Sequence, residues 1–139
     1  MKKLLLLLLA GWLLLANVDW FTEQAWWPGS FSGASSESSL LVRGVEVRDL
    51  DGRVAWRGDV DIGSALARIE RGERDPHRND GGVFHNRERR LPNRPSGHYR
   101  EYVIRTPGIS HAGPQRLVIG RDGEVFYTSD HYRSFRRIQ

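Results

Sequence analysis

Three side chains that could act together on one phosphate lie in the C-terminal half of the chain: the carboxylate of Glu101, the guanidinium of Arg116 and the imidazole of His131. Cleaving RNA through its own 2′-hydroxyl needs a base, an acid for the departing 5′ oxygen, and positive charge on the phosphate. Glu101, His131 and Arg116 fit these roles in that order, and no metal is required. A neighbouring carboxylate is expected to hold the imidazole protonated. Because the attacking group is the 2′-hydroxyl, DNA cannot be a substrate.

Strand alternation would bring these groups onto one face of a small sheet. The patterns of residues 101–105, 116–119 and 125–128 predict three strands of an antiparallel meander, and the third ends just before the imidazole. Successive side chains of a strand point to opposite faces, so Glu101 and Arg116 share a face that we expect to point outward. The opposite, buried face would carry Tyr102, Ile104, Leu117 and Ile119.

A second group of residues is suited to recognising a base. In the run Phe84-His85-Asn86-Arg87-Glu88, the Glu88 carboxylate could accept from the two adjacent N–H donors of guanine. Backbone N–H groups of a tight loop could donate to O6 of guanine, a pattern that adenine cannot satisfy. Phe84 and Tyr132 are the aromatic candidates for stacking on the base, which is worth about 1–3 kcal/mol.

In order and spacing, the chain from about Val54 to Gln139 resembles the secreted microbial guanyl-specific ribonucleases, the family of barnase and ribonuclease Sa. The resemblance implies transesterification to a 2′,3′-cyclic phosphate followed by its hydrolysis, and cleavage of single-stranded RNA after guanosine. It also implies catalytic roles for Glu101, Arg116 and His131, and guanine binding by Glu88 and the backbone of the preceding loop. The segments that carry it are Asp80–Glu88, Leu91-Pro92, Tyr99–Tyr102, Thr106–Gly108, Arg116 and Tyr127–Tyr132, with Phe135 and Ile138 behind them.

One position departs from the family pattern. The family places a second phosphate-binding Arg four residues before the one matched by Arg116, and this chain has Ala112 there. The loss of one such contact would cost about 2–4 kcal/mol of transition-state stabilisation. We therefore expect lower activity or an optimum shifted toward acidic pH, unless His111, Arg105 or Arg87 supplies the missing charge.

The remaining pattern predicts an α+β fold, with a helix packed on a small twisted antiparallel sheet. Residues 61–72 read as an amphipathic helix with Asp61 as its cap and Gly72 as its stop. Before it, alternating valines around Asp51-Gly52 predict an extra leading hairpin. The charged stretch 71–82 reads as a surface loop.

The N-terminal region predicts export. Residues 1–27 begin with Met1-Lys-Lys and an apolar run that is short for a spanning helix, which is typical of a signal peptide. No clean cleavage site follows, and aromatics such as Trp26 prefer a membrane interface, so an uncleaved anchor is the alternative. Residues 28–39 have the composition of a flexible linker, and residues 40–139 would form the ribonuclease domain. The protein is then secreted or periplasmic, or held at the membrane through its N-terminus.

Composition agrees with a single basic domain. The formal net charge is +4, the pI is about 10.0, and the length leaves no room for a second large core. Such a charge favours a polyanionic partner, here single-stranded RNA. The chain has no cysteine, so its stability must come from packing. We expect a monomer.

Other interpretations stay open. A lone Glu on a strand is usually solvated, and we take His77 and His98 as ordinary surface residues. A catalytically weak RNA-binding or toxin-like domain would keep the fold and the guanine pocket but lose rate with the missing Arg. A module that binds anionic envelope surfaces through its basic face is a third class. A ribonuclease in the wrong compartment is lethal, so either export alone or a barstar-like inhibitor would protect the producing cell.

Overall fold

The structure is a computed structural model that describes residues 40–139. The predicted signal peptide or anchor (1–27) and the predicted linker (28–39) lie outside the described residues. Within residues 40–139, no helix is both long and apolar enough to cross a membrane.

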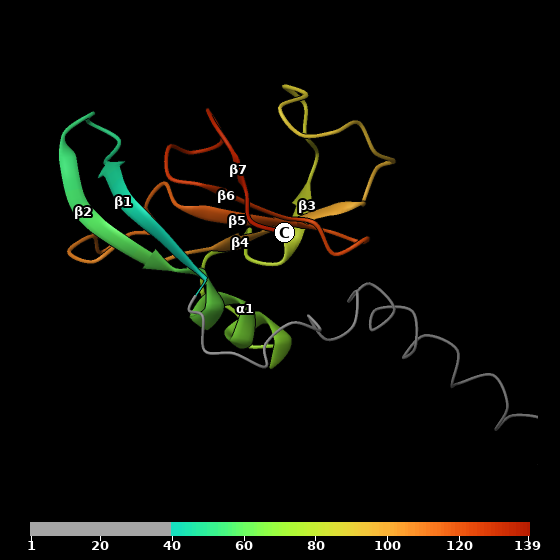
Figure 1. The fold of residues 1–139 in the computed structure, drawn as a ribbon, viewed down its shortest axis with the longest axis horizontal. Helices are drawn as coiled ribbons and strands as arrows, with labels where there is room; N and C mark the ends of the chain where they lie inside the picture. Colours follow the sequence, from blue (N-terminus) through green and yellow to red (C-terminus); the bar gives the residue numbers. More distant parts are fainter. Residues whose placement is uncertain (1–39) are drawn as a thin grey trace, which may run out of the picture.

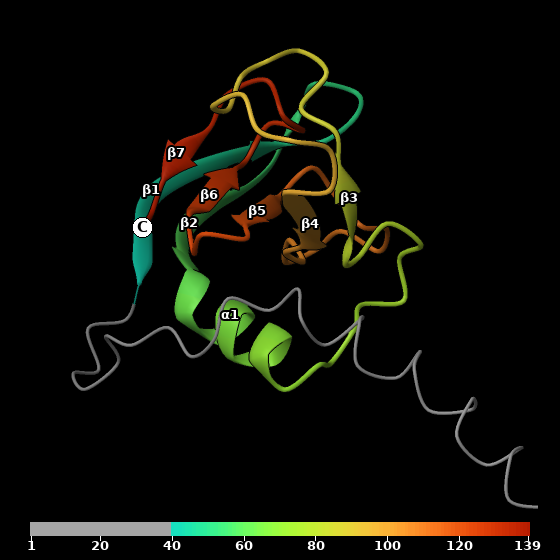
Figure 2. The same cartoon turned by 90° about the vertical axis from the view of Figure 1, so that its right-hand side faces the viewer.

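The described chain forms a hairpin, one helix and a five-stranded antiparallel sheet (Figure 1). The sheet has the order β3-β4-β5-β6-β7, and α1 lies beneath one of its faces (Figure 2). This confirms the predicted α+β fold with its leading hairpin. The elements are β1 (Leu41–Arg48), β2 (Val54–Asp61), α1 (Ile62–Glu70), β3 (Gly82–Phe84), β4 (Tyr99–Val103), β5 (Arg116–Gly120), β6 (Val125–Thr128) and β7 (Arg136–Arg137).

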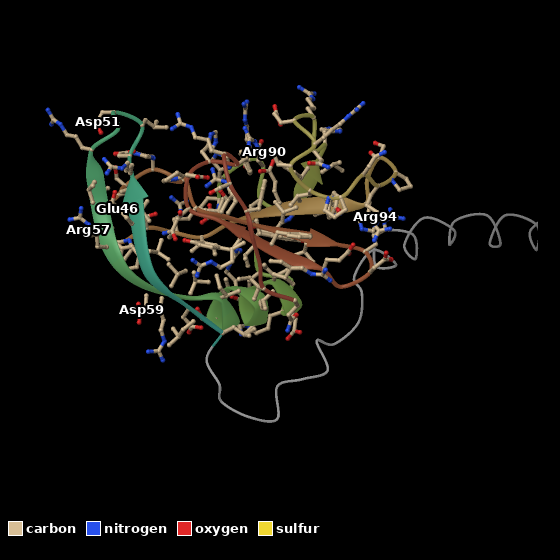
Figure 3. The ribbon with its side chains drawn as sticks, turned by 45° about the horizontal axis from the view of Figure 1, so that its top comes forward. Glu46, Asp51, Arg57, Asp59, Arg90 and Arg94 are labelled. Carbon is tan, nitrogen blue, oxygen red and sulfur yellow. The ribbon has the colours of Figure 1, made fainter. Side chains whose placement is uncertain are left out.

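The leading hairpin is part of the core. Val42, Val45 and Val47 of β1 are buried and join the same apolar cluster as the helix. The turn between β1 and β2 contains Gly52 at φ 81°, a backbone conformation that suits glycine. On the hairpin, which Figure 3 shows to one side of the five-stranded sheet, Arg57 donates to Glu46 over 2.7 and 2.9 Å.

The helix begins and ends close to the predicted residues. The side chain of Asp61 accepts from the backbone N–H of Ser64 at 3.3 Å and caps the first turn, and Gly72 follows the helix at φ 70°. Ile62, Leu66 and Ile69 form the buried stripe. They pack beneath the sheet, in the same cluster as Tyr102, Ile104, Leu117, Ile119 and Tyr127.

Both faces of the sheet are covered, which corrects the prediction that Glu101 and Arg116 point outward. Above the face opposite the helix, Leu91, Tyr99, Val118 and Phe126 form a second apolar cluster. Phe84 at the end of β3 and Phe135 in the loop before β7 pack on it. Sequence alternation places residues on a face correctly, but it does not reveal that distant loops will fold over that face.

The segment between α1 and β3 is a loop, as predicted, but it has a buried anchor that the sequence did not indicate. The Asp80 side chain accepts from the backbone N–H of Val103 at 2.8 Å and of Asp75 at 2.9 Å, and it pairs with Arg68 at 3.2 Å. Asp75 in turn forms a two-pronged pair with Arg105, at 2.6 and 2.7 Å. These bonds fix the loop against the end of β4.

Candidate functional site

A cleft of about 630 Å³ opens on the side of the sheet opposite α1, where β3 pairs with β4. Its lining contains every residue that the sequence singled out for catalysis or base binding. Three come from the sheet and the loop after β6: Glu101, Arg116 and His131. The others come from β3 and its following loop, or neighbour the imidazole: Phe84, His85, Asn86, Arg87, Glu88 and Tyr132.

Glu101 and Arg116 owe their common side to the sheet register. Glu101 pairs with Val118 and Val103 pairs with Arg116, so the two side chains lie on the same face of neighbouring strands. Only 8% of Glu101 and 4% of Arg116 is exposed. A buried carboxylate and a buried guanidinium thus lie on the same face of neighbouring strands and both line the cleft.

The Arg116 guanidinium is oriented by the backbone and keeps one donor unused. Its Nη1 donates to the carbonyl oxygens of Gly113 and Gln115, at 2.7 Å each. Its Nε is buried and has no hydrogen-bond partner among residues 40–139. Arg116 also lines the cleft, so this backbone-oriented guanidinium places a fixed positive charge beside it, which suits an anionic ligand.

His131 stands at the rim of the cleft on the loop that follows β6. Its φ is 55° and that of Tyr132 is 69°, and the backbone N–H of Tyr132 donates to Thr128 Oγ1 at 3.1 Å. Partial burial and then the charge of Arg116 lower the pKa of His131, and the opposing effect of Glu101 does not compensate. The prediction that the neighbouring carboxylate holds this imidazole protonated is therefore wrong for the free protein.

Tyr132 contacts Glu101, His131 and Phe84 together. Its hydroxyl donates to the Glu101 carboxylate, and burial followed by this hydrogen bond raises the pKa of Tyr132. Its ring centroid lies 5.2 Å from that of Phe84 and 4.7 Å from that of His131. The phenol therefore stays protonated and donates to the carboxylate, while its ring borders the same cleft.

The loop after β3 is shaped by Asn86. Its side-chain amide donates to the carbonyl oxygen of Leu91 at 2.8 Å and its side-chain oxygen accepts from the Leu91 N–H at 3.0 Å. The backbone at Asn86 and Arg89 is left-handed, with φ of 49° and 52°. This clamp holds the loop tight and leaves Glu88 exposed at the cleft. A tight loop of this kind presents several backbone N–H groups to one ligand.

The structure separates the cations that could replace the missing second Arg by whether they line the cleft. Arg105 is paired with Asp75, and His111 pairs with Asp49 at 3.1 Å, so neither lines the cleft. Arg87 does line it.

Two further basic residues that sequence reasoning missed, His77 and Arg78, also line the cleft. His77 was taken as an ordinary surface residue; its Nδ1 lies 3.3 Å from the N–H of Asn79, as an acceptor. In the neutral ring, Nε2 then carries the proton. The signal that could have found them is the position of this loop directly before β3.

The prediction that His98 is a surface residue is wrong. Only 8% of His98 is exposed, and its Nε2 lies 3.2 Å from Glu124, which also pairs with Arg94 at 3.3 Å. Burial works against ionisation of Glu124, but its hydrogen bonds and neighbouring cations outweigh it and lower the carboxyl pKa. This network lies at the β5–β6 turn and shares no residue with the cleft.

Comparisons with known proteins agree with this geometry. A family model described as ribonuclease matches residues 60–139. Guanyl-specific ribonuclease St of Saccharopolyspora erythraea is 50% identical over 68 residues, which is 49% of this chain and 67% of that enzyme. Guanyl-specific ribonuclease Sa3 of Kitasatospora aureofaciens is 45% identical over 71 residues, half of each chain. A structure of ribonuclease Sa2 in complex with mononucleotides superposes with a TM-score of 0.52, at 39% identity, and covers 55% of this chain and 79% of that one.

Proposed function

This chain belongs to the microbial guanyl-specific ribonuclease family, and from that premise we propose that it is an endoribonuclease that cleaves single-stranded RNA on the 3′ side of guanosine. The observation that carries the proposal is the joint presence of Glu101, Arg116 and His131 in one cleft, directly beside the loop that carries Glu88. The reaction runs in two steps, transesterification to a 2′,3′-cyclic phosphate and then hydrolysis of that ester.

In the first step, Glu101 removes the proton of the 2′-hydroxyl, and that oxygen attacks the adjacent phosphorus. The bond to the 5′ oxygen of the next nucleotide breaks, and His131 donates a proton to that oxygen. In the second step the roles reverse, so that His131 activates water and Glu101 protonates the 2′ oxygen. The Arg116 guanidinium lines the cleft and supplies positive charge to the phosphate, whose negative charge grows in the transition state. None of these steps uses a metal.

The base is selected by the loop of residues 85–88. Glu88 accepts from the two N–H donors of guanine, and backbone N–H groups of His85, Asn86 and Arg87 face O6. Phe84 and Tyr132 supply the aromatic wall on which the base stacks. The left-handed backbone at Asn86 and its clamp on Leu91 support this assignment, because hydrogen bonds within the chain hold the loop in a tight turn.

We further propose that residues 40–139 form the catalytic domain of a monomeric, exported enzyme. The apolar run that follows Lys2 and Lys3 supports export. Cleavage or retention of that segment decides whether the enzyme is free or anchored, and a barstar-like inhibitor is the partner to look for in the producing cell. The complete set of acid, base and cation argues against a domain that only binds RNA.

The test is digestion of a defined single-stranded RNA by the purified protein, with EDTA present, from pH 4 to 8. We expect cuts only after G, with 2′,3′-cyclic phosphate ends. Glu101→Gln and His131→Ala should each abolish cleavage, whereas Glu73→Gln, an exposed carboxylate remote from the cleft, should not. Folded wild-type protein that does not cut RNA, or full activity in both site variants, would overturn the assignment.

A further inference from the structure

A second cleft, of about 450 Å³, lies between the turn of the leading hairpin and the loop that follows β6. Among the described residues, the only one that lines both this cleft and the first is His131. The hairpin turn and the loop between β6 and β7 lie at the same end of the molecule, away from α1 (Figures 1 and 2). The second cleft is therefore entered beside the imidazole. Its lining includes Arg48, Asp49, Leu50, Pro114, Asp130 and Arg133.

One wall of this cleft is additional to the family. The family model begins at residue 60, so β1 and most of β2 precede the matched region. The wall is nevertheless fixed in place. Val47 of β1 is fully buried in the core, and Asp49 at the start of the turn pairs with His111 on the loop before β5. A rigid wall added next to a reactive group is suited to binding part of the substrate.

The direction of the RNA chain indicates which part. In the proposed reaction, guanosine occupies the first cleft and His131 protonates the 5′ oxygen of the nucleotide that departs. That nucleotide must therefore begin at the imidazole and continue away from the guanine loop. We propose that the second cleft is the binding site for the nucleotide on the 3′ side of the scissile phosphate, an inference that rests on the proposed ribonuclease activity.

The lining suits a nucleotide that carries a further phosphate. Leu50 is 81% exposed and offers an apolar surface at the mouth of the cleft, where a base can lie. Arg133 is exposed and forms no ion pair within residues 40–139, so it is free to meet the next phosphate.

The acidic residues of the cleft already have partners and do not repel that phosphate strongly. Glu46 pairs with Arg48 at 2.5 Å and with Arg57 at 2.7 Å, and Asp49 pairs with His111. The Asp130 side chain accepts from the Ser134 hydroxyl at 2.6 Å and the Ser134 N–H at 2.9 Å.

Two substrates separate this site from the catalytic centre. The trinucleotide GpUpU places a nucleotide in the second cleft, whereas guanosine 2′,3′-cyclic phosphate, the substrate of the second step, has none to place there. In Leu50→Ala and Arg133→Ala we expect kcat/KM for GpUpU to fall about tenfold each, the loss of one charge-assisted or apolar contact. Hydrolysis of the cyclic phosphate should stay within about twofold of wild type, because its reacting atoms touch neither side chain.

Arg53→Ala is the matched control. Arg53 lies on the same hairpin turn, its side chain is 89% exposed, and it does not line the second cleft. It should leave both reactions unchanged. Equal losses on both substrates would mean that Leu50 and Arg133 act through His131, and no loss on GpUpU would mean that the cleft is empty during cleavage; each would overturn the site. A wild-type protein that hydrolyses neither substrate would instead overturn the proposed activity, and this inference with it.

Discussion

The hydroxyl of Tyr132 donates a hydrogen bond to the carboxylate of Glu101, which is the proposed acceptor of the 2′-hydroxyl proton. Glu101 lies on β4, whereas Tyr132 lies on the loop that follows β6. The hydrogen bond holds the base in place and the aromatic ring in the cleft at once. Substrate binding therefore has to share or displace this bond before the base can act.

Tyr132→Phe separates these two contributions. The variant keeps the ring next to Phe84 but loses the donor to Glu101. We expect kcat for GpUpU to fall about fivefold, because the hydrogen bond that holds the base in place, worth about 1 kcal/mol, is lost. KM should change little. Tyr132→Ala should also raise KM, because it removes the stacking surface. Steady-state kinetics on the two variants checks this, and identical KM values would contradict the role of the ring.

The pH dependence of cleavage should report the state of His131. Burial and the charge of Arg116 lower the pKa of this imidazole below its ordinary 6.5. The acid form that protonates the leaving group is thus present below that pKa and is lost as the pH rises through it. We expect kcat/KM for the first step to fall on the basic side with a break below pH 6.5. His111→Asn, outside the cleft, should leave the break unchanged, and a break above pH 6.5 would contradict the lowered pKa.

Ala112 occupies the position of the family's second phosphate-binding Arg, so a substitution there tests how much that charge contributes to the rate. Ala112→Arg should raise kcat for RNA, by up to about a hundredfold if the new guanidinium reaches the phosphate as an extra anion-stabilising donor.

In the wild type, Arg78 lines the cleft, and its removal tests whether it contacts a phosphate of the RNA. We expect Arg78→Ala to lower kcat/KM and to weaken its dependence on salt, because one phosphate contact is lost. The exposed Arg43→Ala is the control for net charge. Equal rates for Arg78→Ala and Arg43→Ala at every salt concentration would exclude Arg78 from the phosphate site.

Asp80 should be a main determinant of stability. Its side chain is fully buried and serves Val103, Asp75 and Arg68 together. Asp80→Ala would leave two buried backbone donors without their acceptor and the largely buried Arg68 guanidinium without its counter-charge, although Arg68 keeps the carbonyl oxygens of Glu73 and Val103. We expect a cost of about 3–5 kcal/mol in the free energy of unfolding. Urea denaturation measures this. Asp51→Ala removes an exposed ion pair with Arg53 and one exposed hydrogen bond from the Arg53 N–H, so it should cost no more than about 1.5 kcal/mol.

Local patterns predicted much of this fold, and long-range contacts account for what they missed. The Asp61 cap, Gly72 and the valine alternation of the hairpin are signals within a few residues, and each element was found. The shared side of Glu101 and Arg116 also followed from strand alternation alone. Their burial, the approach of the loop with His77 and Arg78, and the His98–Glu124 pair depend on segments far apart in the sequence. The lowered pKa of His131 depends on the partial desolvation of the imidazole itself and on the charge of Arg116, which together outweigh Glu101, so its direction was predicted wrongly.

The left-handed backbone at His131 and Tyr132 carries a thermodynamic consequence. A residue with a Cβ atom is destabilised by about 1–2 kcal/mol in this region. Interactions with neighbouring residues must therefore hold the short loop that carries His131 in this conformation. Thr128 and Asp130 provide that restraint. A glycine in this loop would relax it and release the imidazole from its fixed position in the lining of the first cleft. Substitutions that stabilise the protein by relaxing this turn should therefore lower its turnover. Substitutions that raise stability without loss of activity are expected in other parts of the chain.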